Sequence, residues 1–148
     1  MNEDDFEKLL EELQQKIEYE EEATYSKIVI QEYRNPSNFG IIKDPDAIGV
    51  VKGSCNDTMK ITLRIEKGMV KDACFWTDGC GATIACGSML TKTIKGKTIE
   101  EVINITSDQL TNILGGLPKE HLHCSKLAVD TLQKAIAQYH TKKDRRKT

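Results

Sequence analysis

Three of the five cysteines lie in short polar or glycine-rich segments, where a thiol can reach a bound group. Cys55 follows Gly53-Ser54, Cys80 lies between two glycines, and Cys124 follows His123. No two cysteines form a Cys-x-x-Cys pair, the local spacing that zinc fingers and thioredoxin-like sites use. Five is also an odd number, so any disulfide scheme within one chain leaves a thiol unpaired. The three cysteines therefore predict metal ligands or reactive thiols, provided that the fold brings two loops and a helix start together.

Asp57 and His123 would add a carboxylate and an imidazole to these thiolates. Such a soft, anionic donor set suits iron-sulfur clusters and zinc, whereas magnesium and calcium prefer oxygen ligands. Taken one at a time, each cysteine is more often a small buried hydrophobe. We expect packing for Cys74, which lies in mid-strand. We also expect packing between helix and sheet for Cys86, with a place near the site as the lesser alternative.

Strand patterns surround the first two of these cysteines. Residues 48–53 form a short β-branched run, and apolar and polar residues alternate through 59–65, which is typical of a half-buried strand. Lys67-Gly68 predicts a turn into a partner strand over 69–77. After Gly81 the apolar residues recur with the spacing of a helix. We therefore predict an α+β fold with a small antiparallel three-stranded sheet and helices packed on one of its faces.

Helix signals lie on both sides of the strand region. A short helix over 25–33 is ended by Asn35-Pro36, because the residue before proline avoids helical geometry. After the strands, one helix ends at Gly96, and a second begins at Thr98 with a capping-box glutamate three residues on. The sequence predicts a third short helix over 107–114 and a long final helix from near Pro118.

The first 22 residues predict an acidic amphipathic helix that extends the core fold. Its apolar residues recur at offsets of three and four: Phe6, Leu9, Leu10, Leu13 and Ile17. This segment carries a net charge of -8, and the remainder of the chain carries +6. Because an isolated helix of this length is marginal in water, we expect it to dock on the body of its own chain or of a twin subunit, near Tyr25. A solvated appendage is the alternative.

Length and composition describe one globular domain of 148 residues, with 39% hydrophobic and 30% charged residues. We expect this domain to span residues 23–140 and to be followed by a basic flexible tail over 141–148. The acidic N-terminus does not resemble a signal peptide, and no apolar run is long enough to cross a membrane. These features favour a cytoplasmic protein without a nucleic-acid or membrane partner.

Several local motifs occur in the order known from one protein family. They are Tyr25-Ser26-Lys27, Asn35-Pro36-Ser37-Asn38-Phe39-Gly40, the Cys55-x-Asp57 loop, Asp72-Ala73-Cys74-Phe75 leading to Gly79-Cys80-Gly81, Gly96-Lys97-Thr98, and Leu122-His123-Cys124-Ser125. From about Tyr25 to Tyr139 the chain resembles the IscU/NifU-type iron-sulfur cluster assembly scaffolds, whose N-terminal domain has the fold class predicted above.

The resemblance implies a non-enzymatic scaffold. A pyridoxal-phosphate cysteine desulfurase delivers sulfur, iron joins it, and a labile [2Fe-2S] cluster forms and passes to an apo-protein. Cys55, Cys80 and Cys124 would be the cluster thiolates, with Asp57 and His123 as exchanging ligands. Cys124 or Cys55 would accept the persulfide sulfur. Zinc could occupy the same ligands in the apo form, and a homodimer or higher oligomer is possible.

Two other functions compete with the scaffold. The first is a zinc-containing sulfurtransferase that accepts persulfide on a cysteine. The spacing from Cys80 to Cys124 argues against it, because it leaves no room for the extra segment that this branch of the family carries. The second is a purely structural zinc domain. The family's chaperone-binding stretch, Leu-Pro-Pro-Val-Lys, is replaced here by Leu117-Pro118-Lys119-Glu120-His121, which argues against a dedicated chaperone as partner. Asn56 also replaces a usual glycine in the first cysteine loop.

Overall fold

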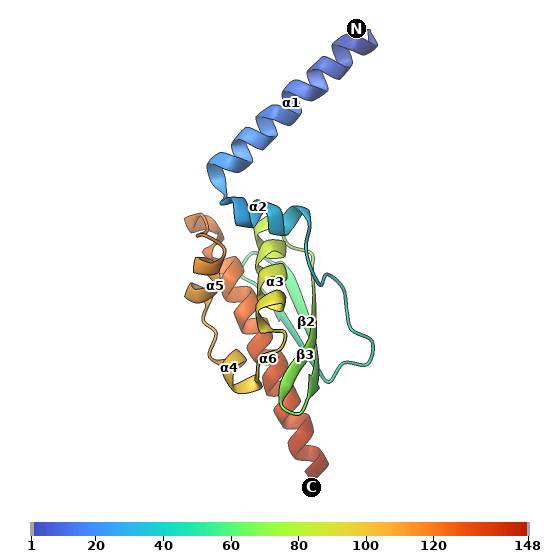
Figure 1. The fold of residues 1–148 in the computed structure, drawn as a ribbon, viewed down its shortest axis with the longest axis vertical. Coiled ribbons are helices and arrows are strands. Elements are labelled where there is room, and N and C mark those ends of the chain that lie inside the picture. The colour runs from blue at the N-terminus through green and yellow to red at the C-terminus, as the bar shows by residue number, and fades with distance from the viewer. Residues whose placement is uncertain (1, 148) are drawn as a thin grey trace.

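The computed structural model describes residues 2–147. Its elements, in chain order, are α1 (Glu3–Thr24), α2 (Lys27–Arg34), β1 (Ala47–Lys52), β2 (Thr58–Glu66), β3 (Met69–Thr77), α3 (Gly81–Ile94), α4 (Ile99–Ile103), α5 (Ser107–Ile113), the short 3-10 helix η1 (Lys119–His121) and α6 (Leu122–Lys147). Figure 1 shows them as a body from which α1 projects. None of the helices described is long and apolar enough to cross a membrane.

The three strands form one antiparallel sheet in the order β1-β2-β3. In β2 the alternate side chains of Met59, Ile61 and Leu63 are fully buried, as the apolar alternation predicted. Lys67 and Gly68 both have positive φ values, which suits the tight two-residue turn between β2 and β3. The predicted hairpin over 57–66 and 69–77 is therefore confirmed.

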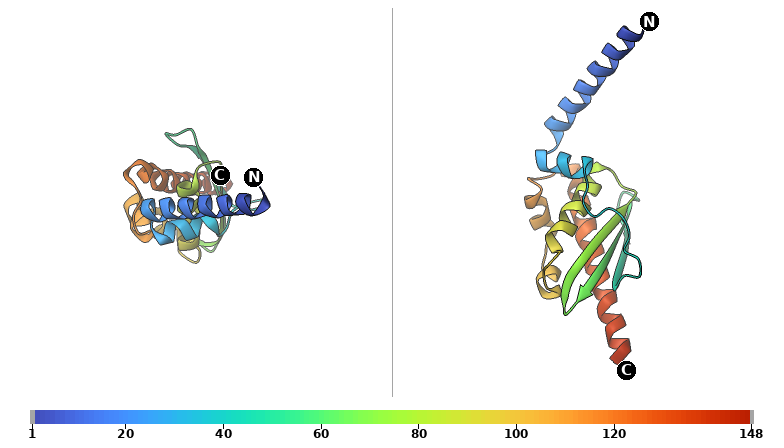
Figure 2. Two further views of the ribbon diagram at one scale, coloured as in Figure 1. Left: turned by 90° about the horizontal axis from the view of Figure 1, so that it is seen from above. Right: turned by 45° about the vertical axis from the view of Figure 1, so that its right-hand side comes forward.

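Helices α3 and α6 pack on one face of this sheet (Figure 2), so the predicted α+β architecture is confirmed. Gly49 of β1 is needed for the close approach of α6. A Cβ atom at Gly49 would lie 2.3 Å from the carbonyl oxygen of Thr131 and 2.6 Å from the backbone nitrogen of Ala135. Backbone atoms cannot move aside as a side chain can, so a side chain at this position would force α6 away from the sheet.

The loop over 35–46 first pairs with the edge of β3 and then crosses the face of the sheet opposite the helices, where Ile42 N–H donates to the Thr62 hydroxyl. Gly40 N–H donates to the carbonyl of Phe75, and the ring of Phe39 lies edge-on to that of Phe75. The shorter helices α4 and α5 begin with complete capping boxes at Thr98 and Thr106, of which the first was predicted. These caps satisfy amides that the helices themselves leave without partners.

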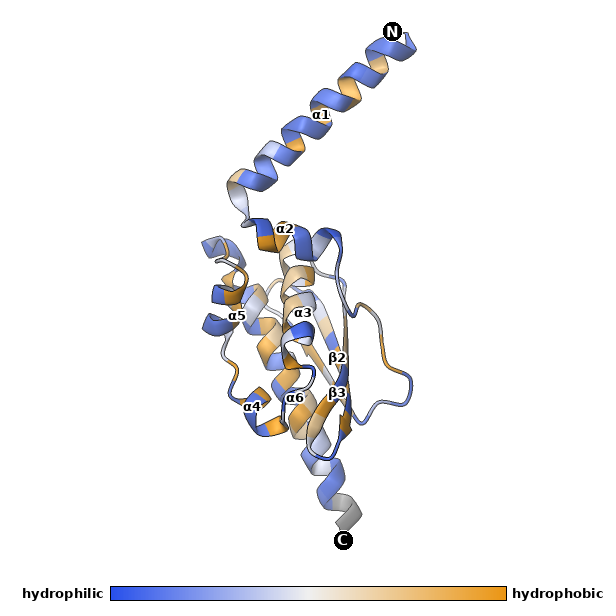
Figure 3. Cartoon of the chain, viewed as in Figure 1, coloured by the Kyte–Doolittle hydropathy of each residue, from blue (hydrophilic) through white to orange (hydrophobic). Residues whose placement is uncertain are grey.

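Helix α1 does not dock on the body of its own chain. It contains no buried residue, and its apolar stripe remains about half exposed, from 41% at Leu9 to 53% at Phe6. Tyr25, which follows the helix, is extended and directs α1 away from the body (Figure 3). The expectation of docking on its own chain is therefore wrong, and the ion pair between Glu21 and Arg34 links α1 to α2. Docking on a twin subunit stays a prediction.

Removal of residues 1–22 should leave the thermal stability of the monomer nearly unchanged. The deletion exposes no buried side chain and removes one exposed ion pair, a contact that contributes at most about 1 kcal/mol. We expect the melting midpoint of the truncated apo-protein, followed by circular dichroism, to stay within about 3 °C of the full chain. Val29→Ala, which truncates a fully buried side chain of α2, is the positive control. A drop as large as that of the control would mean that α1 packs on the body.

The segment after Thr141 is helical, and its flexibility stays a prediction. Helix α6 continues to Lys147, and Thr148 lies outside the described residues. The physical reason is that lysine and arginine are good helix formers, and no glycine or proline follows Pro118 to end the helix.

Candidate metal centre

Three segments far apart in the sequence meet at one end of the sheet. The start of β2 lies beside the end of β3, because the two strands are antiparallel and Met59 pairs with Thr77. The loop before β2 therefore meets the turn after β3, and Thr58 N–H donates to Asp78 Oδ1 at 2.7 Å. The start of α6 completes the site, since His123 lines the same cavity as Cys55 and Cys80. An open cavity of about 410 Å³ results.

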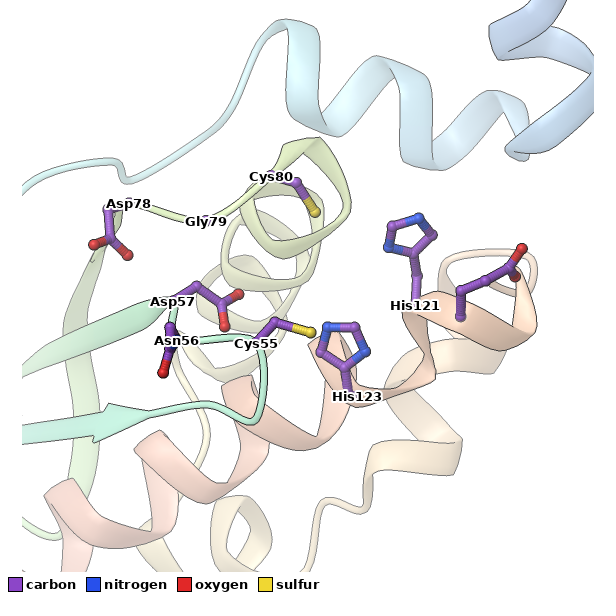
Figure 4. A pocket seen from close by; sticks show the side chains of 9 residues that line it. Cys55, Asn56, Asp57, Asp78, Gly79, Cys80, His121 and His123 are labelled. Atoms are coloured by element: carbon purple, nitrogen blue, oxygen red, sulfur yellow. The ribbon is translucent and has the colours of Figure 1, made fainter.

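Figure 4 shows the side chains around this cavity. Its lining consists of Cys55, Asn56, Asp57, Asp78, Gly79, Cys80, Glu120, His121 and His123. Four of the five predicted site residues line it, and Cys124 lies buried beneath it. The thiols of Cys55 and Cys80 are therefore exposed at this end of the sheet, whereas that of Cys124 is buried.

Cys80 is an exposed thiol at the N-terminus of α3, where it is the N-cap residue. Partial burial raises the pKa of this thiol, but hydrogen bonding from Thr83 and from the Ala82 amide outweighs that effect, so the pKa lies below its ordinary value. Free amides at a helix N-terminus favour an anion. Cys80 is therefore prepared to act as a thiolate.

Cys124 has the opposite environment. It is fully buried in the first turn of α6, and burial together with the nearby Cys80 thiol raises its pKa to about 12, against a smaller opposing effect of Thr83. Its sulfur lies 3.4 Å from Thr83 Oγ1 and 3.6 Å from His123 Nε2. Without a metal, Cys124 is thus a protonated thiol at neutral pH.

The carboxylate of Asp57 points into the same region. Thr83 Oγ1 donates to Asp57 Oδ2 at 3.1 Å, whereas Oδ1 is buried without a hydrogen-bond partner. A buried carboxylate oxygen without a partner is costly, which is typical of a position where a cation binds. Gly53 and Gly79 leave the space for this carboxylate, because a Cβ atom on either would come within 2.9 Å of it.

Cys55 lies at the exposed tip of the loop between β1 and β2, and its sulfur points toward the ring of His123 (Figure 4). The loop is closed by hydrogen bonds between Gly53 and Asp57 and between Asn56 and Gly53. Asn56 has φ +64°, in the left-handed region that asparagine tolerates better than most residues. This explains how Asn56 can replace the glycine that is usual at this point.

The structure adds three residues to the site that the sequence did not indicate. The Thr83 hydroxyl lies between Asp57 and the two thiols of Cys80 and Cys124. His121 forms a compact group with the same two cysteines, and Tyr25 contacts the far side of its ring. The sequence contains one signal for Thr83 and one for His121. Thr83 follows Cys80 by three residues and His121 precedes Cys124 by three, a spacing that places each pair on one face of a helix.

The other two cysteines lie outside this cluster. Cys86 is fully buried in α3, and burial raises its pKa well above the ordinary value. Cys74 lies half-buried in β3, where burial also raises its pKa. Both have the packing environments that the sequence predicted.

Comparison with known proteins assigns this arrangement to a family. Residues 24–146 match the family model described as NifU-like N terminal domain. The chain belongs to this family. The match confirms the resemblance found in the sequence motifs, and it begins where α1 ends, so α1 lies outside the matched residues.

Three relatives illustrate the similarity. Iron-sulfur cluster assembly scaffold protein IscU 1 of Archaeoglobus fulgidus is 45% identical over 119 residues, which are 80% of this chain and 78% of that protein. The IscU scaffold protein of Buchnera aphidicola subsp. Acyrthosiphon pisum is 42% identical over 80% of this chain and 97% of its own length. The nitrogen fixation protein NifU of Azotobacter chroococcum is 38% identical over 78% of this chain, but only 38% of that longer protein is covered.

Solved structures share the fold of the NifU-like domain. A NifU-like N-terminal protein from Brucella abortus superposes with a TM-score of 0.63 over 79% of this chain and 94% of that chain, at 20% identity. A putative scaffold protein for the SUF system from Fervidobacterium islandicum gives a TM-score of 0.61 over 76% of this chain and 96% of its own, at 19% identity.

Proposed function

We propose that this protein is a scaffold on which a labile [2Fe-2S] cluster is built from iron and desulfurase-derived sulfur and then passed to apo-proteins. The observation that carries the proposal is that Cys55 and Cys80 line one open cavity beside Asp57, whose Oδ1 atom has no partner, with Cys124 buried beneath it. The family membership and the scaffold names of the relatives support the same function. In this role the protein has no catalytic turnover of its own.

The donor set suits a cluster that must leave again. Thiolates bind iron strongly, whereas a carboxylate such as Asp57 is a harder, weaker ligand for the same ion. The cavity is open, so an incoming thiolate of an acceptor protein can reach the cluster. His123 lies 3.6 Å from Cys124 and is suited to act as an exchanging ligand. The same ligands would take zinc in the apo form.

Cys55 is the better first acceptor of sulfur in the metal-free protein. It is exposed at a loop tip, whereas Cys124 is buried and its pKa is raised to about 12. The Cys55 thiolate would attack the outer sulfur of the desulfurase persulfide, forming a new sulfur-sulfur bond and releasing the desulfurase cysteine as a thiolate. Cys124 can take this role once a bound metal has displaced its proton.

The proposed partners are therefore a cysteine desulfurase and apo-protein acceptors of the cluster. We propose a cytoplasmic setting, because all five cysteines are free thiols and such thiols persist in a reducing compartment. A dedicated chaperone is not among the proposed partners, since His121 stands at the position of the motif lysine.

Anaerobic reconstitution with iron, cysteine and a desulfurase tests the proposal. Absorption and Mössbauer spectra should reveal a [2Fe-2S] cluster that transfers to an apo-ferredoxin. A sample that carries persulfide and zinc but builds no cluster would support a sulfurtransferase instead. A sample that binds zinc and accepts no sulfur would support a structural zinc domain.

The Asp57→Ala variant should assemble the cluster in this assay but release it about tenfold or more slowly, because an exchangeable ligand has been removed. Asp57→Asn is the matched comparison, because it keeps an oxygen that accepts from Thr83 but lacks the charge. We expect the rate of transfer from Asp57→Asn to lie between those of the wild type and Asp57→Ala. A transfer rate equal to the wild type in both variants would remove Asp57 from the mechanism.

A further inference from the structure

His121, Cys80 and Cys124 form the most compact set of metal-binding atoms in the described part of the chain. One ligand atom from each lies within 4.8 Å of the others, and no second group of three such side chains among the described residues meets this limit. The set does not include Asp57 or His123, although both belong to the ligands that the family resemblance implies. His121 therefore lies where a metal ion bound to Cys80 and Cys124 could take it as a third ligand.

The orientation of the His121 ring supports this role. Its Nδ1 atom lies 4.0 Å from the Cys124 sulfur, and its Nε2 atom lies 3.1 Å from the hydroxyl of Tyr25. If Nε2–H donates to Tyr25, the lone pair of Nδ1 faces the thiols. Histidines that bind metals usually donate their other ring N–H to an oxygen acceptor in this way, which fixes both the tautomer and the ring orientation.

Tyr25 is itself held in place. Its ring lies 5.6 Å from that of His121 and packs edge-on against the ring of Tyr33, at 6.0 Å between centroids. The adjacent Ser26 hydroxyl caps α2 and donates to the carbonyl of Leu114, which ties this segment to the α5 region. The Tyr25 hydroxyl is thus held at hydrogen-bond distance from the imidazole.

The local backbone places His121 on the same side as Cys124. His121 ends η1, one helical turn before Cys124, and residues three apart share a helix face. In the family motif a lysine stands at this point. An ammonium cannot bind a metal, so the histidine changes the chemistry that this position offers.

We propose that His121 is a ligand of a single divalent metal ion, together with Cys80 and Cys124, and that Tyr25 is its positioning residue. Two thiolates and one imidazole suit iron(II) or zinc(II) and leave a fourth position open. Cys55 remains outside this set and is free to accept incoming sulfur. The inference deepens the proposed scaffold function, on which it rests for the identity of the metal.

Cobalt(II) titration of the metal-free protein, without any sulfur source, tests this assignment. Ligand-field and thiolate charge-transfer absorption report the coordination, and a competing chelator gives the affinity. We expect His121→Ala and His121→Lys to lose more than about 100-fold in affinity and to lose the tetrahedral spectrum. Tyr25→Phe, which keeps the ring but removes the acceptor, should lose about 10–100-fold.

His140→Ala is the matched control, because His140 is an exposed histidine on α6. Circular dichroism of each apo variant checks that it is folded. If His121→Ala does not fold, Tyr25→Phe and His121→Lys still decide the test. The assignment is overturned if His121→Lys binds cobalt as tightly as His140→Ala. It is also overturned if His123→Ala loses more affinity than both His121 variants, because His123 would then be the nitrogen ligand.

Reconstitution of the same wild-type sample separates this inference from the proposed function. If the wild type builds no cluster while the His121 variants lose cobalt affinity, the scaffold function fails and the ligand assignment stands. If the wild type builds and transfers a cluster while the His121 variants bind cobalt normally, the scaffold function stands and the assignment fails.

Discussion

The Cys80→Ser variant is expected to fold and to build no stable cluster. Serine is among the best N-cap residues, so it preserves the start of α3, where Cys80 is the N-cap. It removes a thiolate, however, and its hydroxyl has no comparable affinity for iron or zinc. Loss of one ligand from the compact set of Cys80, His121 and Cys124 should lower cobalt affinity by more than about 100-fold.

Cluster content after anaerobic reconstitution and cobalt affinity measure this loss. Cys74→Ser is the matched control, because Cys74 is a half-buried cysteine of β3 that lies outside the site. The control should assemble cluster like the wild type. Wild-type cluster content in Cys80→Ser, or equal losses in the two variants, would contradict the assignment of Cys80.

Much of the fold can be predicted from the sequence because its signals are local. Alternation through Met59–Ile65 identifies a strand with one buried face, and Lys67-Gly68 identifies its return. The register shift between Arg64 and Ile65 has no such local signal. The capping box at Thr98 is equally local. The helical course of the chain after Thr141 depends on competition between helix propensity and charge repulsion, which has no single local signal.

The N-terminal helix shows a different limit. Its amphipathic stripe correctly indicated a helix, but the stripe says only that a surface is apolar and not what covers it. The direction of α1 is set by the extended conformation at Tyr25, whose ring packs toward His121. That contact joins residues far apart in the sequence, and no local pattern encodes it.

The candidate site was also only partly predictable. Cys55, Asp57, Cys80 and His123 line the cavity, in agreement with their polar and glycine-rich surroundings. The burial of Cys124 and the position of Thr83 between three site groups depend on how α3 packs against α6. In the sequence His121 stands out only as a departure from a chaperone-binding motif. Its closeness to Cys80 exists only in the folded chain.

The largest difference expected between two thiols of this site is in their reactivity. Cys80 is exposed and its pKa lies below the ordinary value, because hydrogen bonding at the start of α3 outweighs partial burial. Cys124 is buried and its pKa is raised to about 12. Only the thiolate is nucleophilic, so a lowered pKa increases the reactive fraction at neutral pH and a raised pKa decreases it.

At pH 7 a thiol with a pKa near 12 is ionised in only about one molecule in 100,000, whereas an ordinary thiol is ionised in roughly one in 30. We therefore expect iodoacetamide to modify Cys80 of the metal-free protein more than about 1000-fold faster than Cys124, since burial also blocks the reagent. Raising the pH from 7 to 9 should increase the rate at Cys80 less steeply than the rate at Cys124, which should rise about tenfold per pH unit throughout. Differential alkylation followed by mass spectrometry of the peptides measures both rates, with the buried Cys86 as an internal unreactive control.

Equal rates at Cys80 and Cys124 would show that the Cys124 thiol is already ionised or exposed in the apo-protein. In that case Cys124 could accept sulfur without a metal, and the proposed priority of Cys55 would be wrong.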